Sequence, residues 1–438
     1  MSDALPLPPR PNLEQYRKLA RELQRACKPG EPGAIRDWAA RWAERLARLQ
    51  GAGITPEARR RIDIEAERLP HRWREFQKRS EPAALCTLSA AQFFLARAHG
   101  FPSWPAFASH LELLASPNSE VSHFEEAVDA IVRGDTATLQ KLLRDRPALA
   151  QARSTREHRS TLLHYVSANG VEGFRQKTPP NIVEIAKMLL EAGADVRAES
   201  DAYRGRSTTL GLTATSCHPQ NAGVQIPLME LLIEHGAAID GPDSGSAVND
   251  CLHNGRGEAA EFFANRGARL DMEAAAGVGR LDVVRSFFSE DGSLKPEVTH
   301  KQLIDGFTWA CEFGRNAVVE FLLRKSIAAG AKLSRGETGL HWAAYEAHPD
   351  TVRLLLEHGA PIDAIDETYQ GTPLEWALYA WGNRSEEASY YEVAALLAAA
   401  GAKLAPEWFE DDEDRKRAAA KLRSDPRMLA ALRGAMPQ

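Results

Sequence analysis

A short motif recurs through this chain of 438 residues and constrains its fold more than any other feature. The string LLEAGAD, at residues 189–195, returns as LIEHGAAID from Leu232 and as LLEHGAPID from Leu355, with a weaker copy, FANRGARLD, from Phe263. A periodic apolar stretch precedes each copy, which is typical of an amphipathic helix. Because one short helix pair cannot bury its apolar face alone, such self-similarity predicts units that stack on one another.

A second recurring string opens each unit. It reads STLLHYVSANG from Ser160, ETGLHWAAYEAH from Glu337 and GTPLEWALYA from Gly371. The units resemble ankyrin repeats, whose pattern is a turn, G-x-T-P-L-H-x-A-A, a short loop, a second helix and G-A. In this pattern Thr372 can cap the first helix and Gly359 can supply the left-handed conformation that ends the second.

The register of this pattern places eight repeats along the chain. Their Thr-equivalent positions are near Glu125, Thr161, Thr208, Ser246, Leu270, Asp305, Thr338 and Thr372. Repeats two, three and eight carry extra residues between their helices, in enlarged loops near Val171, Ser216 and Trp381. The resemblance implies an all-α solenoid of about eight helix-turn-helix units with short β-hairpin fingers, preceded by a small helical domain.

We expect three regions along the chain: an N-terminal helical capping domain at 1–115, the repeat array at 116–405 and a C-terminal capping helix at 406–438. Residues 1–115 indicate four or five helices, at Leu13–Cys27, Ala34–Leu49, Pro56–Lys78, Ser89–His99 and Ser103–Leu114. The end of this region resembles the helical leader that precedes the repeats in many bacterial ankyrin-repeat proteins. We expect it to cover the apolar face of the first repeat, and a separate recognition module is the alternative. In the last region, acids at 410–414 precede bases at 415–417, which suits a helix that starts near the acids.

Composition bears on the compartment. The longest apolar runs are about ten residues, well short of the roughly 20 that cross a bilayer, and the first residues lack the basic and apolar stretches of a secretory signal. We therefore expect a cytoplasmic protein with no membrane partner.

The five cysteines are an odd number, widely spaced and without a CxxC pair, so we expect reduced, buried thiols.

Signatures of catalytic and cofactor sites are missing from the sequence. It contains no phosphate-binding loop, no dinucleotide fingerprint, no HExxH and no GxSxG. We therefore expect no cofactor and no metal site, and no catalytic residue can be named.

Some of the motif residues have a structural interpretation. His164 and His341 occupy the His position of the repeat, where an imidazole can bond to the neighbouring turn and connect adjacent repeats. Trp309, Trp342 and Trp376 recur at spacings of 33 and 34 residues, which predicts a stacked column in the core between repeats rather than a ligand pocket.

The two positions after the A-A of each first helix face the concave groove in ankyrin-repeat proteins and vary between them. We expect partner binding at the polar and aromatic residues among these positions: Asn169, Thr215, Ser216, His253, Asn254, Glu312, Phe313, Tyr345, Glu346 and Tyr379. Tyr and Phe give large contact area at low entropic cost. The family resemblance therefore favours a protein–protein interaction scaffold that binds through the groove, the fingers and the enlarged loops.

The charge distribution suggests the character of the partner. Residues 1–115 contain 19 Lys and Arg against 13 Asp and Glu, whereas the remainder contains 35 against 47. An acidic array predicts a protein partner with a basic surface. The sequence does not indicate an oligomeric state.

Two other functions stay open. An enzyme could use Glu273, Glu312, Glu346 or His253 as acid and base under the enlarged loops, and it would need a closed pocket that holds a carboxyl of raised pKa. Nucleic-acid binding could use the basic N-terminal helices, where Arg59, Arg60, Arg61, Arg68, Arg72, Arg74, Lys78 and Arg79 lie near Trp38, Trp42 and Trp73. Acidic residues interleave the same stretch, which favours a solvated helix with ion pairs over a nucleic-acid interface.

Overall fold

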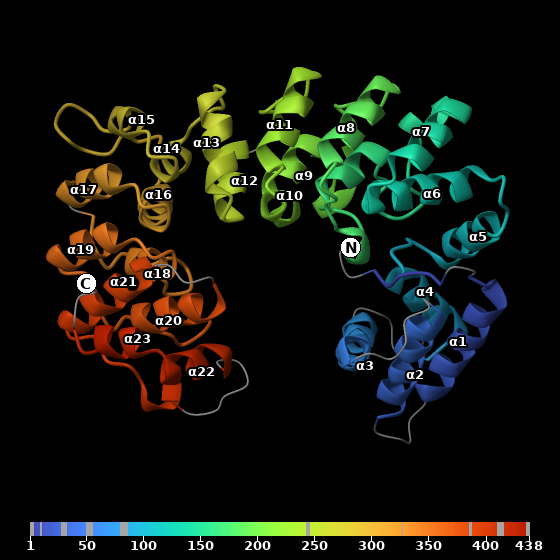
Figure 1. The fold of residues 1–438 in the computed structure, drawn as a ribbon, viewed down its shortest axis with the longest axis horizontal. Coiled ribbons are helices and arrows are strands. Elements are labelled where there is room, and N and C mark those ends of the chain that lie inside the picture. Colours follow the sequence, from blue (N-terminus) through green and yellow to red (C-terminus); the bar gives the residue numbers. More distant parts are fainter. Residues whose placement is uncertain are drawn as a thin grey trace. The chain divides into compact units, whose positions relative to one another are not determined.

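The structure of the chain is a computed structural model. It describes residues 4–8, 11–27, 33–49, 56–78, 86–241, 246–325, 327–384, 388–409 and 416–434. It divides into two compact units, Met1–Ile239 and Asp240–Gln438, here called the N-terminal unit and the C-terminal unit. Each unit is built mainly of short helices (Figure 1).

Five helices begin the N-terminal unit: α1 (Leu13–Ala26), α2 (Ala34–Leu49), α3 (Pro56–Lys78), α4 (Leu88–Ala98) and α5 (Trp104–Leu114). The helices expected in this stretch are confirmed, with boundaries that differ by at most one residue. The side chains of Asn12, Thr87 and Ser103 cap α1, α4 and α5, which satisfies backbone N–H groups that a helix start leaves free. These helices enclose an aromatic core of their own, with Trp38, Trp73, Phe101 and Phe107 fully buried.

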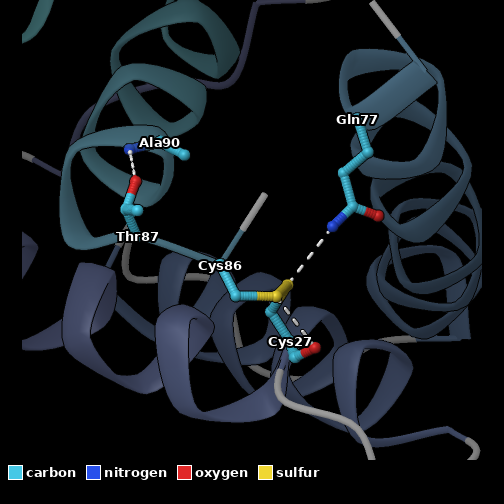
Figure 2. Close-up of a disulfide and its surroundings, with 5 residues drawn as sticks. All are labelled: Cys27, Gln77, Cys86, Thr87 and Ala90. Carbon is cyan, nitrogen blue, oxygen red and sulfur yellow. Dashed lines mark hydrogen bonds between the residues drawn. A yellow bond between two sulfur atoms is a disulfide. The ribbon is translucent and has the colours of Figure 1, made fainter. Parts of the chain in front are cut away.

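A disulfide joins Cys27, at the end of α1, to Cys86, just before α4 (Figure 2). The expectation of five reduced, buried thiols is therefore wrong for these two residues. It failed because the α2–α3 pair between them brings together two cysteines that are 59 positions apart in the chain, and sequence spacing does not reveal that return. Among the remaining three, Cys251 and Cys311 are buried free thiols and Cys217 is half-buried.

The rest of the N-terminal unit holds helix pairs with enlarged connections. The elements are α6 (Glu120–Arg133), α7 (Thr136–Asp145), the 3-10 turns η2 (Pro147–Gln151) and η3 (Leu162–Ser167), α8 (Ile182–Glu191), α9 (Thr209–Thr215) and α11 (Gln225–Glu234). The first and second enlarged loops contain η4 (Gly173–Arg175) and α10 (Cys217–Asn221). An antiparallel hairpin pairs β1 (Glu199–Ser200) with β2 (Ser207–Thr208) and carries the 3-10 turn η5 (Ala202–Arg204).

The C-terminal unit consists of helix pairs that form two rows. The pairs are α12 (Ala247–His253) with α13 (Gly257–Asn265), α14 (Met272–Gly277) with α15 (Leu281–Ser286), α16 (His300–Glu312) with α17 (Asn316–Arg324), α18 (Gly339–Tyr345) with α19 (Pro349–Glu357), and α20 (Pro373–Asn383) with α21 (Ala388–Ala399). First helices contact first helices from α12 to α20, and second helices contact second helices from α15 to α21 (Figure 1). One continuous apolar core fills the space between the rows from Met272 onward.

The end of the C-terminal unit differs from the single capping helix that we expected. After a 3-10 turn, η6 (Pro406–Phe409), two helices follow, α22 (Lys416–Ser424) and α23 (Pro426–Ala431). Asp425 caps α23 and Pro426 occupies its first turn, and a proline at this place ends one helix and starts the next. The acids at 410–414 lie outside the described residues. Because α22 contacts α20 and α23 contacts α21, the two helices continue both rows.

Within the described ranges, no helix combines the length and the apolar character needed to cross a bilayer.

Candidate functional site

Two buried histidines connect successive repeats through their rings. The Nδ1 atom of His341 accepts a hydrogen bond of 3.2 Å from the backbone N–H of Thr338, and its Nε2 lies 3.2 Å from the carbonyl oxygen of Gly371 in the next repeat. Since Nδ1 accepts, Nε2 carries the proton and donates. His164 has the same arrangement in the N-terminal unit, with Nε2 3.2 Å from the carbonyl of Ser207. Burial lowers the pKa of His164 to about 4 and also lowers the pKa of His341, so both rings stay neutral at pH 7.

Replacement of His341 by Ala should therefore lower stability without a selective effect on partner binding. The change leaves the Thr338 N–H and the Gly371 carbonyl without their partner inside the core, and it removes a ring that packs 5.2 Å from Trp376. We expect a loss of about 2–3 kcal/mol in the free energy of unfolding, measured by chemical denaturation. An unchanged midpoint would show that the histidine does not connect the repeats.

The tryptophans form a shorter column than the spacing suggests. The rings of Trp342 and Trp376 meet edge to face with centroids 5.2 Å apart. Trp309 instead packs against His253, at 4.5 Å, and no ring contact joins it to Trp342 among the described residues. All three indoles belong to the packing of the C-terminal unit, since Trp309 and Trp376 are less than a tenth exposed.

The expected partner-binding residues lie in both units, and those of the N-terminal unit are engaged within the fold. Asn169 donates from Nδ2 to the Leu212 carbonyl and to Thr215 Oγ1, both at 3.1 Å, and its Oδ1 accepts from Tyr203. Ser216 is buried, and its hydroxyl caps α10. These side chains therefore hold repeats two and three together.

In the C-terminal unit one of the expected residues, Tyr345, belongs to an aromatic cluster. Tyr345 and Tyr369 lie with ring centroids 5.8 and 5.9 Å from Trp376. Tyr369 is 76% exposed, and Tyr379, one helical turn after Trp376 on α20, is 45% exposed. We call Trp342, Tyr345, Tyr369, Trp376 and Tyr379 the aromatic face. The remaining expected residues of this unit lie along the same row: His253 and Asn254 are exposed at the end of α12, and Phe313 is half-buried at the end of α16.

The carboxylate at the edge of the aromatic face already has a partner. Arg384 donates to both oxygens of Glu346 at 2.7 Å, and its guanidinium carbon lies 4.7 Å from the centroid of the Tyr345 ring. This arginine follows α20 at the start of the third enlarged loop. The hydrogen bonds to Glu346 raise the pKa of Arg384 further above its usual value.

Two other carboxyls of the C-terminal unit are hard to ionise. Burial and the charge of Glu346 raise the pKa of Glu312 to about 8. Burial, together with Asp271 and Asp305, raises the pKa of Glu273 to about 7. Raised values of this kind mark candidate functional groups when they occur in a shaped site. Both residues lie outside the unit that carries the enlarged loops near Val171 and Ser216.

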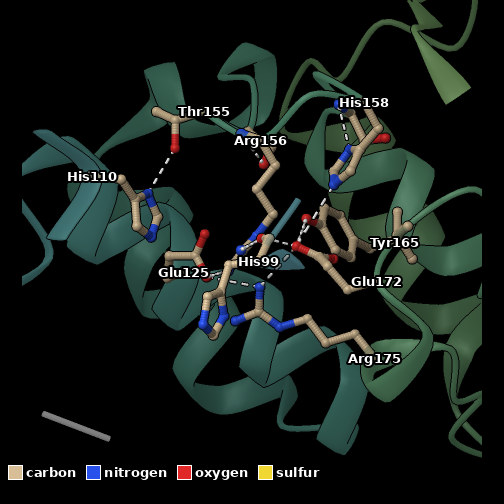
Figure 3. Close-up of polar contacts among 12 residues, drawn as sticks. His99, His110, Glu125, Thr155, Arg156, His158, Tyr165, Glu172 and Arg175 are labelled. Atoms are coloured by element: carbon tan, nitrogen blue, oxygen red, sulfur yellow. Dashed lines mark hydrogen bonds and ion pairs between the residues drawn. The ribbon is translucent and has the colours of Figure 1, made fainter. Parts of the chain in front are cut away.

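A buried network of charged side chains lies in the N-terminal unit, where the first of those loops meets the leader helices (Figure 3). Arg156 has an ion pair with Glu172 and lies 3.4 Å from Glu125. Arg175 lies 2.7 Å from the same oxygen of Glu125 and 2.8 Å from Asp129 at the edge of the network. The four central side chains are all less than a tenth exposed.

The electrostatics of this network favour a structural role. Burial alone would oppose ionisation, but the two arginines outweigh it and lower the pKa of Glu125 and of Glu172. Burial also lowers the pKa of the adjacent His110 to about 4. Both glutamates are therefore fixed anions at pH 7, and neither has the raised pKa that we required of an acid–base group under this loop.

The network also connects the leader helices to residues 155–157, which lie between η2 and η3. Arg156 donates to the carbonyl of His99 at 3.0 Å, His110 Nδ1 lies 2.7 Å from Thr155 Oγ1, and the N–H of Glu157 donates to the carbonyl of Gly100 at 2.9 Å. Our sequence reasoning did not identify this network. One signal was available: Glu125 is a charged residue within the apolar stripe of α6, between Phe124 and Val128.

The structure leaves little support for nucleic-acid binding by the leader. Trp38, Trp42 and Trp73 are buried in its core, where they cannot stack on bases. Several basic side chains have acidic partners: Arg68 with Glu65, Lys78 with Glu75 and Arg59 with Asp63. The side chain of Arg61 and the whole of Arg79 lie outside the described residues.

Comparisons with known proteins identify the repeats. Residues 307–406 match the family model described as ankyrin repeats in three copies. Inversin of Danio rerio is 42% identical over 62 residues, palmitoyltransferase Hip14 of Drosophila melanogaster 37% over 68, and Inversin-A of Xenopus laevis 40% over 78. These segments are 14%, 16% and 18% of this chain but only 6%, 11% and 7% of those relatives.

One solved structure, that of the human ASB11 ankyrin repeat domain, aligns with 64% of this chain and 99% of its own at 18% identity and a TM-score of 0.33. The family match falls on α16 to α21, the helix pairs that carry the Thr338–His341 motif and the aromatic face. The expected helical repeat fold is confirmed there by sequence and structure together. This part of the chain, residues 307–406, therefore resembles ankyrin repeats in its sequence as well as in its helix pairs.

Proposed function

We propose that this chain is a protein–protein interaction module and that it binds a segment of its partner on the aromatic face of the C-terminal unit. The observation that carries this proposal is the exposure of Tyr369 and Tyr379 beside the packed indoles of Trp342 and Trp376. A rigid aromatic platform with exposed phenol rings is typical of residues that dominate binding energy. The finger contributes through Tyr369, whose backbone N–H donates to the buried Asp366 and is thereby held in place.

The remaining regions would support this role. The leader would act as a cap on the first repeat, an inference supported by the contacts of Arg156 and Glu157 with the end of α4. The pair α22–α23 would cap the other end. A basic partner surface fits the excess of acids after residue 115. Cytoplasmic location and bacterial origin stay predictions from the sequence.

Tyr369→Ala and Tyr379→Ala should each weaken partner binding roughly tenfold or more while the melting temperature stays within a few degrees of the wild type. The reason is that both rings are exposed and contribute little to the core. A partner captured from the source cells by the wild-type chain would be identified, purified and titrated against each variant by biolayer interferometry.

Phe93→Ala is the matched control, because Phe93 is a 38% exposed aromatic residue on α4, outside the aromatic face. Its binding should equal that of the wild type. Equal losses in all three variants, or no loss in the two tyrosine variants, would contradict the proposed face.

A further inference from the structure

Residues 4–8, here called the strap, lie against the end of helix α4. The backbone N–H of Leu5 donates to the carbonyl oxygen of Ala98 at 2.8 Å, and the carbonyl oxygen of Leu5 lies 2.9 Å from Nδ1 of His99. Since a carbonyl can only accept, Nδ1 carries the proton and donates. Leu5 is 6% exposed, and its side chain belongs to the aromatic core of the leader helices.

The two groups that hold Leu5 need an occupant, and we call Ala98 and His99 the leader dock. Ala98 is the last residue of α4, so its carbonyl has no partner within the helix. Both residues of the dock are fully buried, where an unpaired carbonyl or imidazole N–H is unfavourable. One residue of an extended segment satisfies both groups, because it offers one N–H and one C=O.

The dock is also fixed by contacts that do not involve the strap. The His99 ring stacks on Phe107 with centroids 5.2 Å apart and meets the edge of Tyr16 at 5.1 Å. On its backbone side, Arg156 donates to the His99 carbonyl at 3.0 Å. Burial lowers the pKa of His99 to about 3, so the ring stays neutral at pH 7. A site that is fixed in advance binds its ligand with a smaller loss of entropy.

The strap shows which kind of segment the dock accepts. Leu5 is followed by Pro6, and prolines recur at positions 8, 9 and 11. Proline has no N–H, so the residues after the leucine add few donors that need a partner. It also favours the extended backbone that presents one residue to the dock. The site therefore selects an extended segment in which a buried leucine precedes proline.

The strap is held at a single residue. Among the described residues, its backbone hydrogen bonds to the rest of the chain are those of Leu5. Pro6 and Leu7 are only half-buried. A segment with so few contacts can open locally at a small part of the cost of global unfolding, which makes the dock available to another segment.

We propose that the leader dock is a binding site for an extended leucine–proline segment of a partner protein, and that the strap occupies it as an internal ligand which such a segment displaces. The dock lies in the N-terminal unit, whereas the aromatic face lies in the C-terminal unit. The inference therefore adds a second interaction site and does not rest on the proposed function.

A fluorescent peptide of residues 2–11, titrated against the full-length protein, tests this proposal. Leu5→Asp in the protein places a charge in the apolar core and should release the strap. We expect the peptide to bind this variant with a dissociation constant on the order of 100 µM, measured by fluorescence anisotropy. In the wild type the tethered strap competes at an effective concentration on the order of 1 mM. The ratio of the two concentrations predicts binding about tenfold weaker to the wild type.

Three controls accompany the titration. A peptide that carries the Leu5→Asp change should bind neither protein. Leu5→Ala, which removes the anchor without adding a charge, is a second and milder protein variant, and circular dichroism with urea denaturation verifies that each variant is folded. A photoreactive leucine at position 5 of the peptide should crosslink to the leader helices of the folded variants, as identified by mass spectrometry.

Four results would each overturn the proposal: equal binding of the peptide to the wild type and to the folded variants, no binding to any folded variant, binding of the Leu5→Asp peptide, or crosslinks outside the leader helices. A fifth would reassign the occupant. If analytical ultracentrifugation shows a dimer of the wild type that both Leu5 variants lose, a second copy of the chain supplies the segment, and the assignment to a partner protein is wrong.

Discussion

Arg156→Met should destabilise the N-terminal unit by about 3–5 kcal/mol. The guanidinium group lies between Glu125 and Glu172, both less than a tenth exposed, and it also donates to the carbonyl of His99. Removal of one charge from a buried pair leaves its partners unpaired in a medium of low dielectric constant, whereas methionine replaces only the volume. Urea denaturation followed by tryptophan fluorescence would measure the change, since Trp38, Trp42 and Trp73 lie in this unit.

The same variant has a defined pH dependence. The pKa values of Glu125 and Glu172 are lowered in the folded chain, so their contribution to stability is fully present above their unfolded value of 4.5 and is lost as the pH falls below it. The difference between wild type and Arg156→Met should therefore be largest near pH 7 and shrink below pH 4.5. Arg144→Met is the control: the Arg144 side chain is 72% exposed and, among the described residues, has an ion pair with its neighbour Asp145 alone, so its loss should stay below about 0.5 kcal/mol. An equal effect of both changes would contradict the structural role of the network.

Loss of the disulfide should cost the N-terminal unit about 4 kcal/mol. The bond closes a loop with a sequence separation of 59 residues between α1 and α4, and the value follows from the chain entropy that such a closed loop removes from the unfolded state. The variant with both Cys27→Ala and Cys86→Ala should unfold at lower urea than the oxidised wild type. A reducing agent should shift the wild type toward the variant and leave the variant unchanged.

Cys217→Ala provides the control for this experiment, because Cys217 is a half-buried free thiol in the same unit. It should keep the wild-type midpoint and the response to reducing agent. A thiol titration of the unfolded protein, prepared without reductant, decides the matter directly: three reactive thiols are expected, and five would contradict the bond.

The periodic parts of the fold could be predicted from the sequence, because their signal is local. The helices of the leader and the helix pairs around Thr338 and Thr372 follow from apolar stripes, capping residues and glycines that end each helix. The capping boxes that place His341 and Glu375 against those threonines involve residues three apart in the chain. A local motif of this kind survives in the sequence even when the rest of the repeat has diverged.

What could not be predicted depends on contacts between distant residues. Arg384 lies 38 residues from Glu346, and Arg156 lies 57 residues from His99. The repeat pattern does not predict these contacts. Arg384 lies in an enlarged loop and Arg156 lies between η2 and η3, and the path of both segments depends on the folded chain. The disulfide is a third case. For the candidate site, register placed Glu312 and Tyr379 at groove positions but did not indicate that one is buried and the other exposed.

The helix pair α22–α23 has a practical consequence for anyone who cuts this protein into fragments. The family match ends at residue 406, which would be a natural place to end an expression fragment. Gly382 of α20, however, lies so close to Ala418 of α22 that an added Cβ would meet it at 2.3 Å, and the ring of Tyr391 bonds through its hydroxyl to Asp425. A fragment that stops at 406 would expose Trp381 and Tyr391 to water and invite aggregation, so a well-behaved fragment of this end must include α22 and α23.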